Sequence, residues 1–198
     1  MVGYLTGGGL GPLVRSHGFS SDYLLEATVV TGSGDFVTAS ADENQDLLWA
    51  LRGGKYGLGI VTEGKERLVE LDTIYAGSLF FAEDDIEAAL RGWIDWTARA
   101  DERASTSAAV VQFPPLDVVP EPLRGRRLLS LRFAFPGGGA DGEGLAAPLR
   151  ALAPVHLDAL GVVQNVLVVG HLAGKVVDEI GPRSPRALFA YQAELKGT

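Results

Sequence analysis

The sequence lacks cysteine altogether, and this absence excludes several kinds of chemistry. Without thiols the chain forms no disulfide, no thiolate metal site and no cysteine nucleophile. A cysteine-free chain suits a reducing compartment, and we predict a cytoplasmic location. Histidine is scarce as well: His17, His156 and His171 form neither an H-x-x-x-H nor an H-E-x-x-H pattern, so we predict no metal site.

Long hydrophobic runs and an excess of positive charge are also missing. No apolar stretch approaches the roughly 20 residues that a membrane-spanning helix needs, and Met1 is followed by a glycine-rich turn rather than a basic and then apolar leader. The net charge of −8 argues against nucleic acid or an anionic membrane as a partner, because phosphate binding needs concentrated Lys and Arg. The basic cluster of Arg124, Arg126 and Arg127 is too small to reverse that balance.

Glycine, by contrast, is abundant and gathers in two clusters of an otherwise ordinary globular composition. The first is GYLTGGGLGP at residues 3–12, and the second is GGKYGLG at residues 53–59. Glycine backbone adopts positive φ and lets a flat or anionic ligand approach the amide groups closely. The first cluster taken alone is equally typical of a turn or a frayed terminus. It matches neither G-x-G-x-x-G nor G-x-x-x-x-G-K-[ST], which excludes the Rossmann and Walker phosphate loops.

The first part of the chain predicts a small set of short elements. Ser40 to Glu43 has the S-x-x-E pattern of a capping box, followed by a helix through Leu47, Leu48 and Leu51 that ends at Gly53. The other expected elements are a helical turn at 13–18, a buried strand at 24–30, its hairpin partner at 36–39 across a turn at 31–35, and an exposed strand at 60–71.

From residue 73 the pattern changes to longer strands and helices, and we place a domain boundary near Asp72. Apolar residues spaced i, i+3, i+4 and i+7 predict a helix over 83–99, with Trp93 on its buried stripe. Trp96 lies off that stripe, which leaves core packing and substrate stacking both open. The acidic residues Glu83, Asp84 and Asp85 are expected to cap this helix at its positive end.

The remaining elements of the second part are predicted from the alternation of apolar and polar residues and from stretches rich in proline or glycine. Strands are expected at 74–81, 106–113, 128–135 and 162–169, and a helix at 145–152. The strand at 128–135 alternates large apolar with smaller or polar residues, which predicts that one sheet face is covered. Two stretches, FPPLDVVPEPLRG and PGGGADGEG, are predicted loops. Beyond Gly170 the periodicity fades, and no element is predicted there.

Residues 3–62 together resemble one half of the PCMH-type flavin-binding domain of the vanillyl-alcohol-oxidase-like, berberine-bridge-enzyme-like family of FAD-linked oxidases. The resemblance rests on an ordered set of motifs rather than on any single one. These motifs are GGGxG, R-x-x-G, an Asp, a VV-T-x-x-G hairpin, N-x-D-L-x-W-A-L-R-G-G and G-I-V-T.

This resemblance implies an α+β fold for the chain. Residues 1–72 would be the second half of the FAD-binding domain, and residues 73–198 part of a substrate domain with an antiparallel sheet backed by helices. In the family, backbone groups of two separate segments cradle the FAD. Carried over by position, the implied cofactor-binding residues are Gly3, Tyr4, Thr6, Gly7, Gly8, Gly9, Gly59, Ile60 and Val61.

The chain departs from the family pattern at several points. The other flavin half, with its R-G-G-G-H-type loop, would precede residue 1, and the substrate domain stops early, so the resemblance implies truncation at both the N-terminus and the C-terminus. Members with doubly attached flavin use a histidine and a cysteine that this chain lacks in those contexts, which implies noncovalent FAD. Gly64 and Lys65 stand where the family continues an aromatic-containing strand, which disfavours a central position for it. Catalytic residues remain unassigned.

Two functions follow from these observations. The first is an FAD-linked oxidoreductase, a flavoprotein that transfers hydride from an alcohol or amine carbon to flavin, with weak FAD binding and little turnover for the isolated chain. The alternative is a non-catalytic truncated module that self-associates or pairs with a partner polypeptide supplying the missing flavin subdomain. Tyr56, inside the second glycine cluster, is either a flavin or substrate contact or an ordinary loop residue. The substrate is not indicated.

Overall fold

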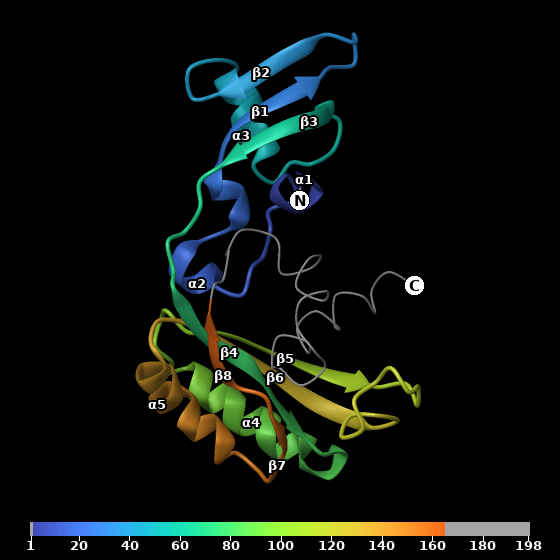
Figure 1. Cartoon of the computed structure of the whole chain (residues 1–198), viewed down its shortest axis with the longest axis vertical. Helices are drawn as coiled ribbons and strands as arrows, with labels where there is room; N and C mark the ends of the chain where they lie inside the picture. Colours follow the sequence, from blue (N-terminus) through green and yellow to red (C-terminus); the bar gives the residue numbers. More distant parts are fainter. Residues whose placement is uncertain (1, 165–198) are drawn as a thin grey trace. The chain divides into compact units, whose positions relative to one another are not determined.

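The computed structural model describes residues 2–164, which form two compact units (Figure 1). Unit 1 comprises residues 2–70 and unit 2 residues 71–164. Both units combine helices with antiparallel sheet, so the α+β class is confirmed. The last residues of the strand expected at 162–169, His171 and everything beyond Gly170 lie outside the described residues.

Unit 1 is built on a three-stranded antiparallel sheet in the order β2-β1-β3. Its strands are β1 (Leu24–Val30), β2 (Phe36–Ser40) and β3 (Ile60–Glu66). The predicted hairpin is confirmed, because Val30 pairs with Phe36 across the tight turn. Strand β3 pairs with β1 along one side only and is largely exposed. This edge position tolerates Gly64 and Lys65, which suit neither a central ladder nor a core.

Helix α3 (Gln45–Leu51) packs on this sheet and closes the core of unit 1. The predicted capping box is wrong, because the helix begins later, after Asn44 at φ 49°. The Ser40 hydroxyl instead accepts the N–H groups of Asp42 and Glu43, which stabilises a turn before the helix. The buried core consists of Leu24, Ala27, Val29, Ala39, Leu48 and Leu51.

Three short helical segments precede this sheet. They are α1 (Val2–Leu5), α2 (Val14–His17) and the 3₁₀ turn η1 (Ser20–Tyr23). Helix α2 is the helical turn that the sequence predicts at 13–18. The first glycine cluster therefore connects two helical segments and runs between ordered elements, so the frayed-terminus alternative is excluded for residues 6–11.

Unit 2 contains a five-stranded antiparallel sheet in which β5-β6-β4-β7 are neighbours and β8 also pairs with β4. The strands are β4 (Thr73–Phe81), β5 (Ser105–Gln112), β6 (Arg127–Pro136), β7 (Val155–Asp158) and β8 (Gly161–Gln164). Strand β4 changes partner from β8 to β7 near Gly77, at φ 146°. A Cβ at Gly77 would lie 2.0 Å from the carbonyl oxygen of Ala159, so this crossing requires glycine.

Helices α4 (Ile86–Thr97) and α5 (Gly139–Arg150) lie side by side on one face of this sheet (Figure 1). Trp93 packs in this core and donates its ring N–H to the Thr106 hydroxyl at 3.0 Å. Trp96 packs edge-on against Phe133, with ring centroids 6.3 Å apart, which assigns it to the core rather than to substrate stacking.

The acidic residues before α4 form a 3₁₀ turn, η2 (Glu83–Asp85), and none of them makes a side-chain cap. Asp85 is nevertheless the N-cap residue of α4, and the expected interaction of these carboxylates with the positive end of the helix stays a prediction. Glu83 instead accepts a hydrogen bond from Arg127 at 2.8 Å, because η2 packs beside β6.

The glycine-rich stretch after Phe135 is helical, so the predicted loop there is wrong. Helix α5 begins at Gly139, and Gly142 lies directly against Tyr75 of β4. A Cβ at Gly142 would come within 2.2 Å of the Tyr75 Cβ atom, so glycine permits a close helix-to-sheet contact. Glycine lowers the stability of a helix, and this close packing offsets that loss. Sequence periodicity does not reveal the contact.

A polar network fastens α5 to the same strand. The Tyr75 hydroxyl donates to the Glu143 carboxylate, and burial together with this bond raises the pKa of Tyr75. Arg150 donates to Glu143 at 2.9 Å and to the Tyr75 oxygen at 3.0 Å. Since these groups satisfy one another, a nearly buried phenol is tolerated at the sheet.

The second face of the unit 2 sheet is also buried, although the alternation in the 128–135 strand predicts that only one face is covered. On β6, Leu128 and Ala134 are nearly inaccessible and Ser130 is fully buried. The proline-rich loop at 113–126 turns back onto this face. It contributes Phe113, Val119 and Leu123, which pack with Phe80 and Leu128.

No helix among the described residues is long and apolar enough to cross a bilayer.

Replacing Gly142 with alanine tests the close packing of α5. We expect Gly142→Ala to lower the free energy of unfolding by about 1–3 kcal/mol, because the added methyl group overlaps the Tyr75 side chain. Gly144→Ala is the matched control in the same helix, where a Cβ meets nothing within 4 Å. This control should be neutral or raise stability by about 0.5–1 kcal/mol. Urea unfolding followed by circular dichroism measures both, and equal stability of the two variants would contradict the packing.

Candidate functional site

The first glycine loop is anchored at its start by Thr6. The Thr6 amide and hydroxyl both donate to the carbonyl of Val2, at 2.9 and 3.0 Å, and the residue is buried. Its side chain therefore closes α1 and does not face a ligand. After Thr6, Gly8 and Gly9 adopt φ of 99° and 67°, which L side chains rarely take.

The same loop is pinned at its far end to η1. The carbonyls of Gly8 and Gly9 accept the N–H groups of Ser21 and Ser20, each at 3.0 Å. A Cβ at Gly9 would lie 2.6 Å from the Ser20 Cβ and 2.9 Å from the Tyr4 ring. Burial raises the pKa of the Tyr4 hydroxyl, and a hydrogen bond with Ser20 opposes that rise. The Tyr4 ring thus packs against the loop at Gly9, while Gly3 on α1 is exposed.

The second glycine cluster leads from α3 into β3. Lys55, at its centre, adopts φ of 51°, one of two positive values for non-glycine residues in the described chain. Gly59 has φ of 118°, and a Cβ there would lie 2.5 Å from the carbonyl oxygen of Val30. Ile60 and Val61 then pair with Val30 and Val29, and the Ile60 side chain is 71% exposed.

The two glycine segments lie against each other. Helix α1 contacts β3 (Figure 1). The Lys55 side chain reaches Gly7, where a Cβ would lie 3.3 Å from the Lys55 Cδ atom and 3.6 Å from its Nζ atom. Within residues 2–164, the amides of Gly7 and Gly9 donate no backbone hydrogen bond. The structure therefore brings the Gly7 amide of the first loop together with a cation of the second, whereas Gly9 is buried against Ser20 and Tyr4.

Lys55 is the residue that sequence reasoning missed. Its signal was present, because Lys55 is the sole cation within the two glycine clusters as written, residues 3–12 and 53–59. Lysine in a glycine-rich bend is a point charge that an anion can reach without obstruction. The family motifs did not point to Lys55, because the resemblance assigns the cofactor contacts to backbone groups and includes no lysine at this position.

This surface is chemically suited to hold an anionic, flat group. Amide donors and one ammonium group fit a phosphate, and a Cβ at Gly3 or Gly8 would meet nothing within 4 Å, which shows open space beside the backbone. Within residues 2–164, no group of three His, Asp or Glu side chains is placed to hold a metal ion. The residues thus offer binding rather than acid-base or metal chemistry.

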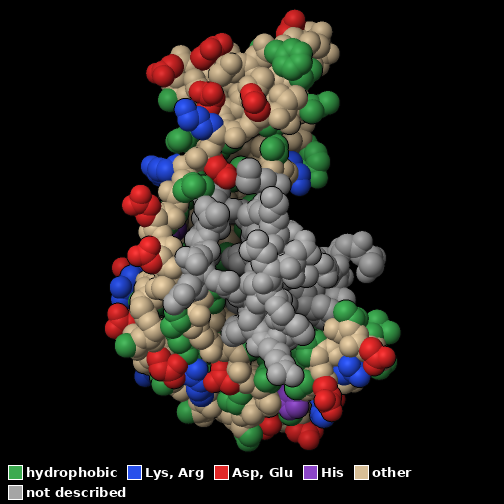
Figure 2. All heavy atoms as spheres, viewed as in Figure 1, with side chains coloured by type: hydrophobic (Ala, Val, Ile, Leu, Met, Phe, Trp, Pro, Cys, Tyr) green, Lys and Arg blue, Asp and Glu red, His purple; other side chains and the backbone are tan. Residues whose placement is uncertain are grey.

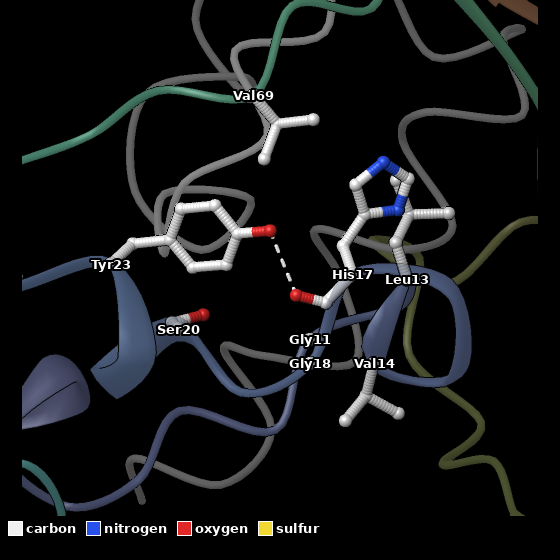
Figure 3. Close-up of a pocket in the computed structure, with 8 residues that line it drawn as sticks. All are labelled: Gly11, Leu13, Val14, His17, Gly18, Ser20, Tyr23 and Val69. Carbon is white, nitrogen blue, oxygen red and sulfur yellow. Dashed lines mark hydrogen bonds between the residues drawn. The ribbon is translucent and has the colours of Figure 1, made fainter.

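A small cavity in unit 1 lies apart from these residues. It measures about 30 Å³ and is lined by Gly11, Leu13, Val14, His17, Gly18, Ser20, Tyr23 and Val69 (Figure 3). The Tyr23 hydroxyl donates to the His17 carbonyl at 2.8 Å across it, and the His17 Nδ1 atom is 2.7 Å from the Ser16 hydroxyl. A space of this size holds about one water molecule, so it is no cofactor site.

A larger cavity of about 430 Å³ opens beside the second glycine cluster, in the size range of small-ligand sites. Arg52 borders it and is fixed by two hydrogen bonds to the Leu24 carbonyl, at 3.0 and 2.6 Å. Trp49 and Tyr56, also on its rim, are 79% and 82% exposed. The Tyr56 ring lies 5.7 Å from the Lys55 Nζ atom, so Tyr56 belongs to this rim and carries a cation on its face. None of the sequence-predicted flavin residues lines either cavity.

The surface charge adds no competing site on the face that Figure 2 displays. Basic side chains there are scattered among acidic ones and form no continuous patch. The absence of a nucleic-acid or membrane partner stays a prediction.

No family model matches the chain. It is 28% identical over 192 residues to the FAD-linked oxidoreductase fogF of Aspergillus ruber, covering 96% of this chain and 38% of the relative. It is 44% identical over 87 residues to the FAD-linked oxidoreductase pgmH of Aspergillus terreus, covering 43% of this chain and 18% of the relative.

Solved structures with a similar fold include two oxidases. The 6-hydroxy-D-nicotine oxidase of Arthrobacter nicotinovorans superposes with a TM-score of 0.68 and 28% identity, covering 83% of this chain and 35% of that one. The glucooligosaccharide oxidase of Acremonium strictum gives a TM-score of 0.61 and 25% identity, covering 83% and 33%. The chain thus spans less than two fifths of the length of these relatives.

The bend that carries Gly59 is tested by substitution. We expect Gly59→Ala to destabilise the chain by more than the roughly 1–2 kcal/mol of an unfavourable φ alone, because its methyl group also collides with the Val30 carbonyl. Gly57→Ala is the matched control, since Gly57 has φ of 77° but open space around its Cβ position. Urea unfolding compares them. If Gly57→Ala proves the more damaging variant, the proposed close approach of Gly59 to β1 is wrong.

Proposed function

We propose, on the premise that this chain belongs to the berberine-bridge-enzyme-like FAD-linked oxidoreductases, that it holds the FAD of a flavin-dependent oxidation. FAD, when bound, supplies the acceptor for hydride from an alcohol or amine carbon. The chain's own residues hold and orient that cofactor. The proposal rests on the meeting of the two glycine segments, where the exposed Gly7 of the first lies beside the Lys55 ammonium group of the second.

The anionic part of the cofactor is assigned to the first loop. Convergent N–H groups and a nearby ammonium group are the donors that a pyrophosphate needs. We assign the backbone of Gly7, Gly8 and Gly9 to this contact. A Cβ at Gly8 would meet open space, Gly9 fixes the turn against Ser20 and Tyr4, and Lys55 beside Gly7 supplies the charge. Gly3 and Tyr4 of α1 flank this loop, and Thr6 acts indirectly by fixing its first turn on Val2.

The flavin ring is assigned to the start of β3. Gly59, Ile60 and Val61 form an exposed edge that is held against β1 by strand pairing. An isoalloxazine ring packs on smooth, close backbone and on apolar side chains. The exposed Ile60 side chain offers the apolar contact, and Gly59, whose Cβ position faces the Val30 carbonyl, holds this backbone close to β1.

The attachment is proposed to be noncovalent. The glucooligosaccharide oxidase carries a 6-S-cysteinyl, 8α-N1-histidyl FAD, and a thioether of this kind needs a cysteine that the present chain lacks. His17 and His156 are engaged elsewhere, His17 with the Ser16 hydroxyl and His156 with the Pro122 carbonyl at 2.6 Å.

The proposed site is open, and this openness limits how tightly we expect it to bind FAD. Apart from the buried Thr6 and Gly9, the residues assigned to FAD are exposed or half-buried, and none of them lines either of the two cavities described in unit 1. A site that covers a large cofactor from one side buries little of it and orders it incompletely. We therefore propose weak FAD binding and little turnover by the isolated chain.

FAD titration tests this assignment through Lys55. The isolated chain should bind FAD with a Kd of about 10 µM or weaker, measured by quenching of flavin fluorescence. Lys55→Ala should weaken FAD binding about tenfold, because it removes one charge-assisted contact. It should leave the binding of riboflavin, which has no phosphate, unchanged.

Lys65→Ala is the matched control, since Lys65 is an exposed lysine on β3 of the same unit. This variant should bind FAD as the unaltered chain does. A purified chain that retains stoichiometric flavin would contradict the weak-binding proposal. An equal loss in both lysine variants would remove Lys55 from the site.

Association with another polypeptide is the second candidate function. Trp49 and Tyr56 expose most of their surface on the rim of the 430 Å³ cavity. Large aromatic side chains exposed together are typical of protein interfaces. We propose that this rim, defined by Trp49, Arg52, Tyr56 and Leu58, packs against a second polypeptide, either a copy of this chain or one carrying the remaining flavin subdomain.

Sedimentation velocity over a range of concentrations tests self-association. We expect concentration-dependent growth that the double variant Trp49→Ser, Tyr56→Ser reduces at least tenfold in affinity. The control is Phe36→Ser, because Phe36 is 72% exposed in the same unit but lies on the β1–β2 hairpin. A monomer at every concentration, with no flavin-dependent change, would count against self-association through this rim.

A further inference from the structure

The two faces of the unit 2 sheet differ sharply in the size of their side chains. The face under α4 and α5 carries large groups such as Leu131, Phe133 and Phe135. Around Arg132, seven of the eight nearest positions on the opposite face of β4, β6 and β5 carry serine or alanine, and the eighth is Phe80, opposite Ser130 on β4. By alternation and register these small residues are Ala76, Ser78, Ser105, Ser107, Ala109, Ser130 and Ala134.

Arg132 stands at the centre of this floor of small residues. It lies on the middle strand β6, opposite Ser78 on β4 and Ser107 on β5. Neither neighbour is large enough to cover a guanidinium group or charged to pair with it. We call this surface the Arg132 face, defined by Arg132 and the seven small residues around it.

The Arg132 side chain has no partner within residues 2–164. Its Nε atom is buried and makes no hydrogen bond, and burial lowers the pKa of the guanidinium with no carboxylate to oppose that effect. Five other arginines pair with carboxylates, namely Arg91, Arg103, Arg124, Arg127 and Arg150. A partly buried guanidinium with unused donors is costly, and an anion relieves this cost.

Ser130 gives a second and independent sign of a ligand on the same face. Its hydroxyl is fully buried and has no hydrogen-bond partner within residues 2–164. It lies two residues before Arg132 on β6, so both side chains belong to the same face. Buried hydroxyl groups are nearly always hydrogen-bonded, and an unpartnered one beside an unpaired cation indicates an absent polar molecule.

We propose that the Arg132 face binds a small organic carboxylate, which pairs with the guanidinium of Arg132 and accepts a hydrogen bond from Ser130. The planar guanidinium fork matches a carboxylate in two parallel hydrogen bonds. The body of the ligand lies on the β5 side of Arg132, over Ser107 and Ala109, which are accessible, whereas Ala76, Ser78 and Ala134 are nearly inaccessible. The apolar cluster of Phe80, Phe113 and Leu128 closes the face at Ser130 and favours a ligand with an apolar end.

Calling this ligand a substrate rests on the proposed function, whereas its binding does not. Arg132 belongs to unit 2 and the residues assigned to FAD belong to unit 1. Arg132→Gln should therefore leave the FAD titration of the isolated chain unchanged. A failure of carboxylate binding and a failure of flavin binding are consequently separate results.

Nuclear magnetic resonance of the complete 198-residue chain tests the proposal directly. The probe is benzoate, titrated at mildly acidic pH while the arginine Nε–Hε signals are followed. We expect a saturable shift of the Arg132 signal with benzoate and none with benzamide, its neutral analogue. The unaltered chain suffices for this observation, so it does not depend on the folding of a variant.

Substitutions then locate the site. Arg132→Gln should weaken benzoate binding at least tenfold, and Arg132→Lys should weaken it less because the charge is kept. Arg127→Gln is the matched control on the same strand, where Arg127 already pairs with Glu83 at 2.8 Å. It should bind benzoate as the unaltered chain does.

Two results would overturn the proposal. The first is a linear, unsaturated response of the Arg132 signal, equal for benzoate and benzamide. The second is a shift of that signal, without any benzoate, in the triple variant Asp178→Asn, Glu179→Gln, Glu194→Gln. That shift would show that a carboxylate of the chain's own C-terminal part already occupies Arg132.

Discussion

The contact between the first glycine loop and Lys55 is the constraint on which the flavin assignment depends. It joins two bends that are far apart in the sequence, and it exists because each bend adopts backbone angles open to few residues. Pairing of β3 with β1 holds the second bend, and the bonds from Ser20 and Ser21 hold the first. Both are therefore positioned before any ligand arrives, which reduces the entropy lost on binding.

In unit 2 the sheet has two faces that differ in the size of their side chains. One face is filled by helices α4 and α5, and the contact at Gly142 lets α5 approach closely. The other face has the floor of small residues around Arg132. An unpaired guanidinium group at this place does not stabilise the fold. Its presence is therefore better explained by ligand binding than by folding.

Local features of the fold could be predicted from the sequence, whereas features set by distant contacts could not. The β1–β2 hairpin follows from a tight polar turn between two apolar runs, and helix α4 from its stripe ending near Trp93. The second half of helix α5 was predicted, as a helix at 145–152, but its glycine-rich first half was missed because the reason for Gly142 is its contact with Tyr75, far earlier in the chain. The role of Trp96 depended likewise on Phe133. The glycine segments of the site were found by resemblance, and Lys55 stood in the sequence as the one cation of the two clusters. The contact of Lys55 with Gly7 and the Arg132 face could not be predicted, because both depend on neighbours across strands or loops.

The most direct test of the central claim is to follow backbone amide signals of the ¹⁵N-labelled chain as FAD is added. If the two bends form one cofactor surface, the largest shifts fall on Gly7, Gly9 and Lys55 together with Gly59 and Ile60, and all five report the same affinity. Shifts confined to one of the two bends, or centred on unit 2 instead, would contradict the account.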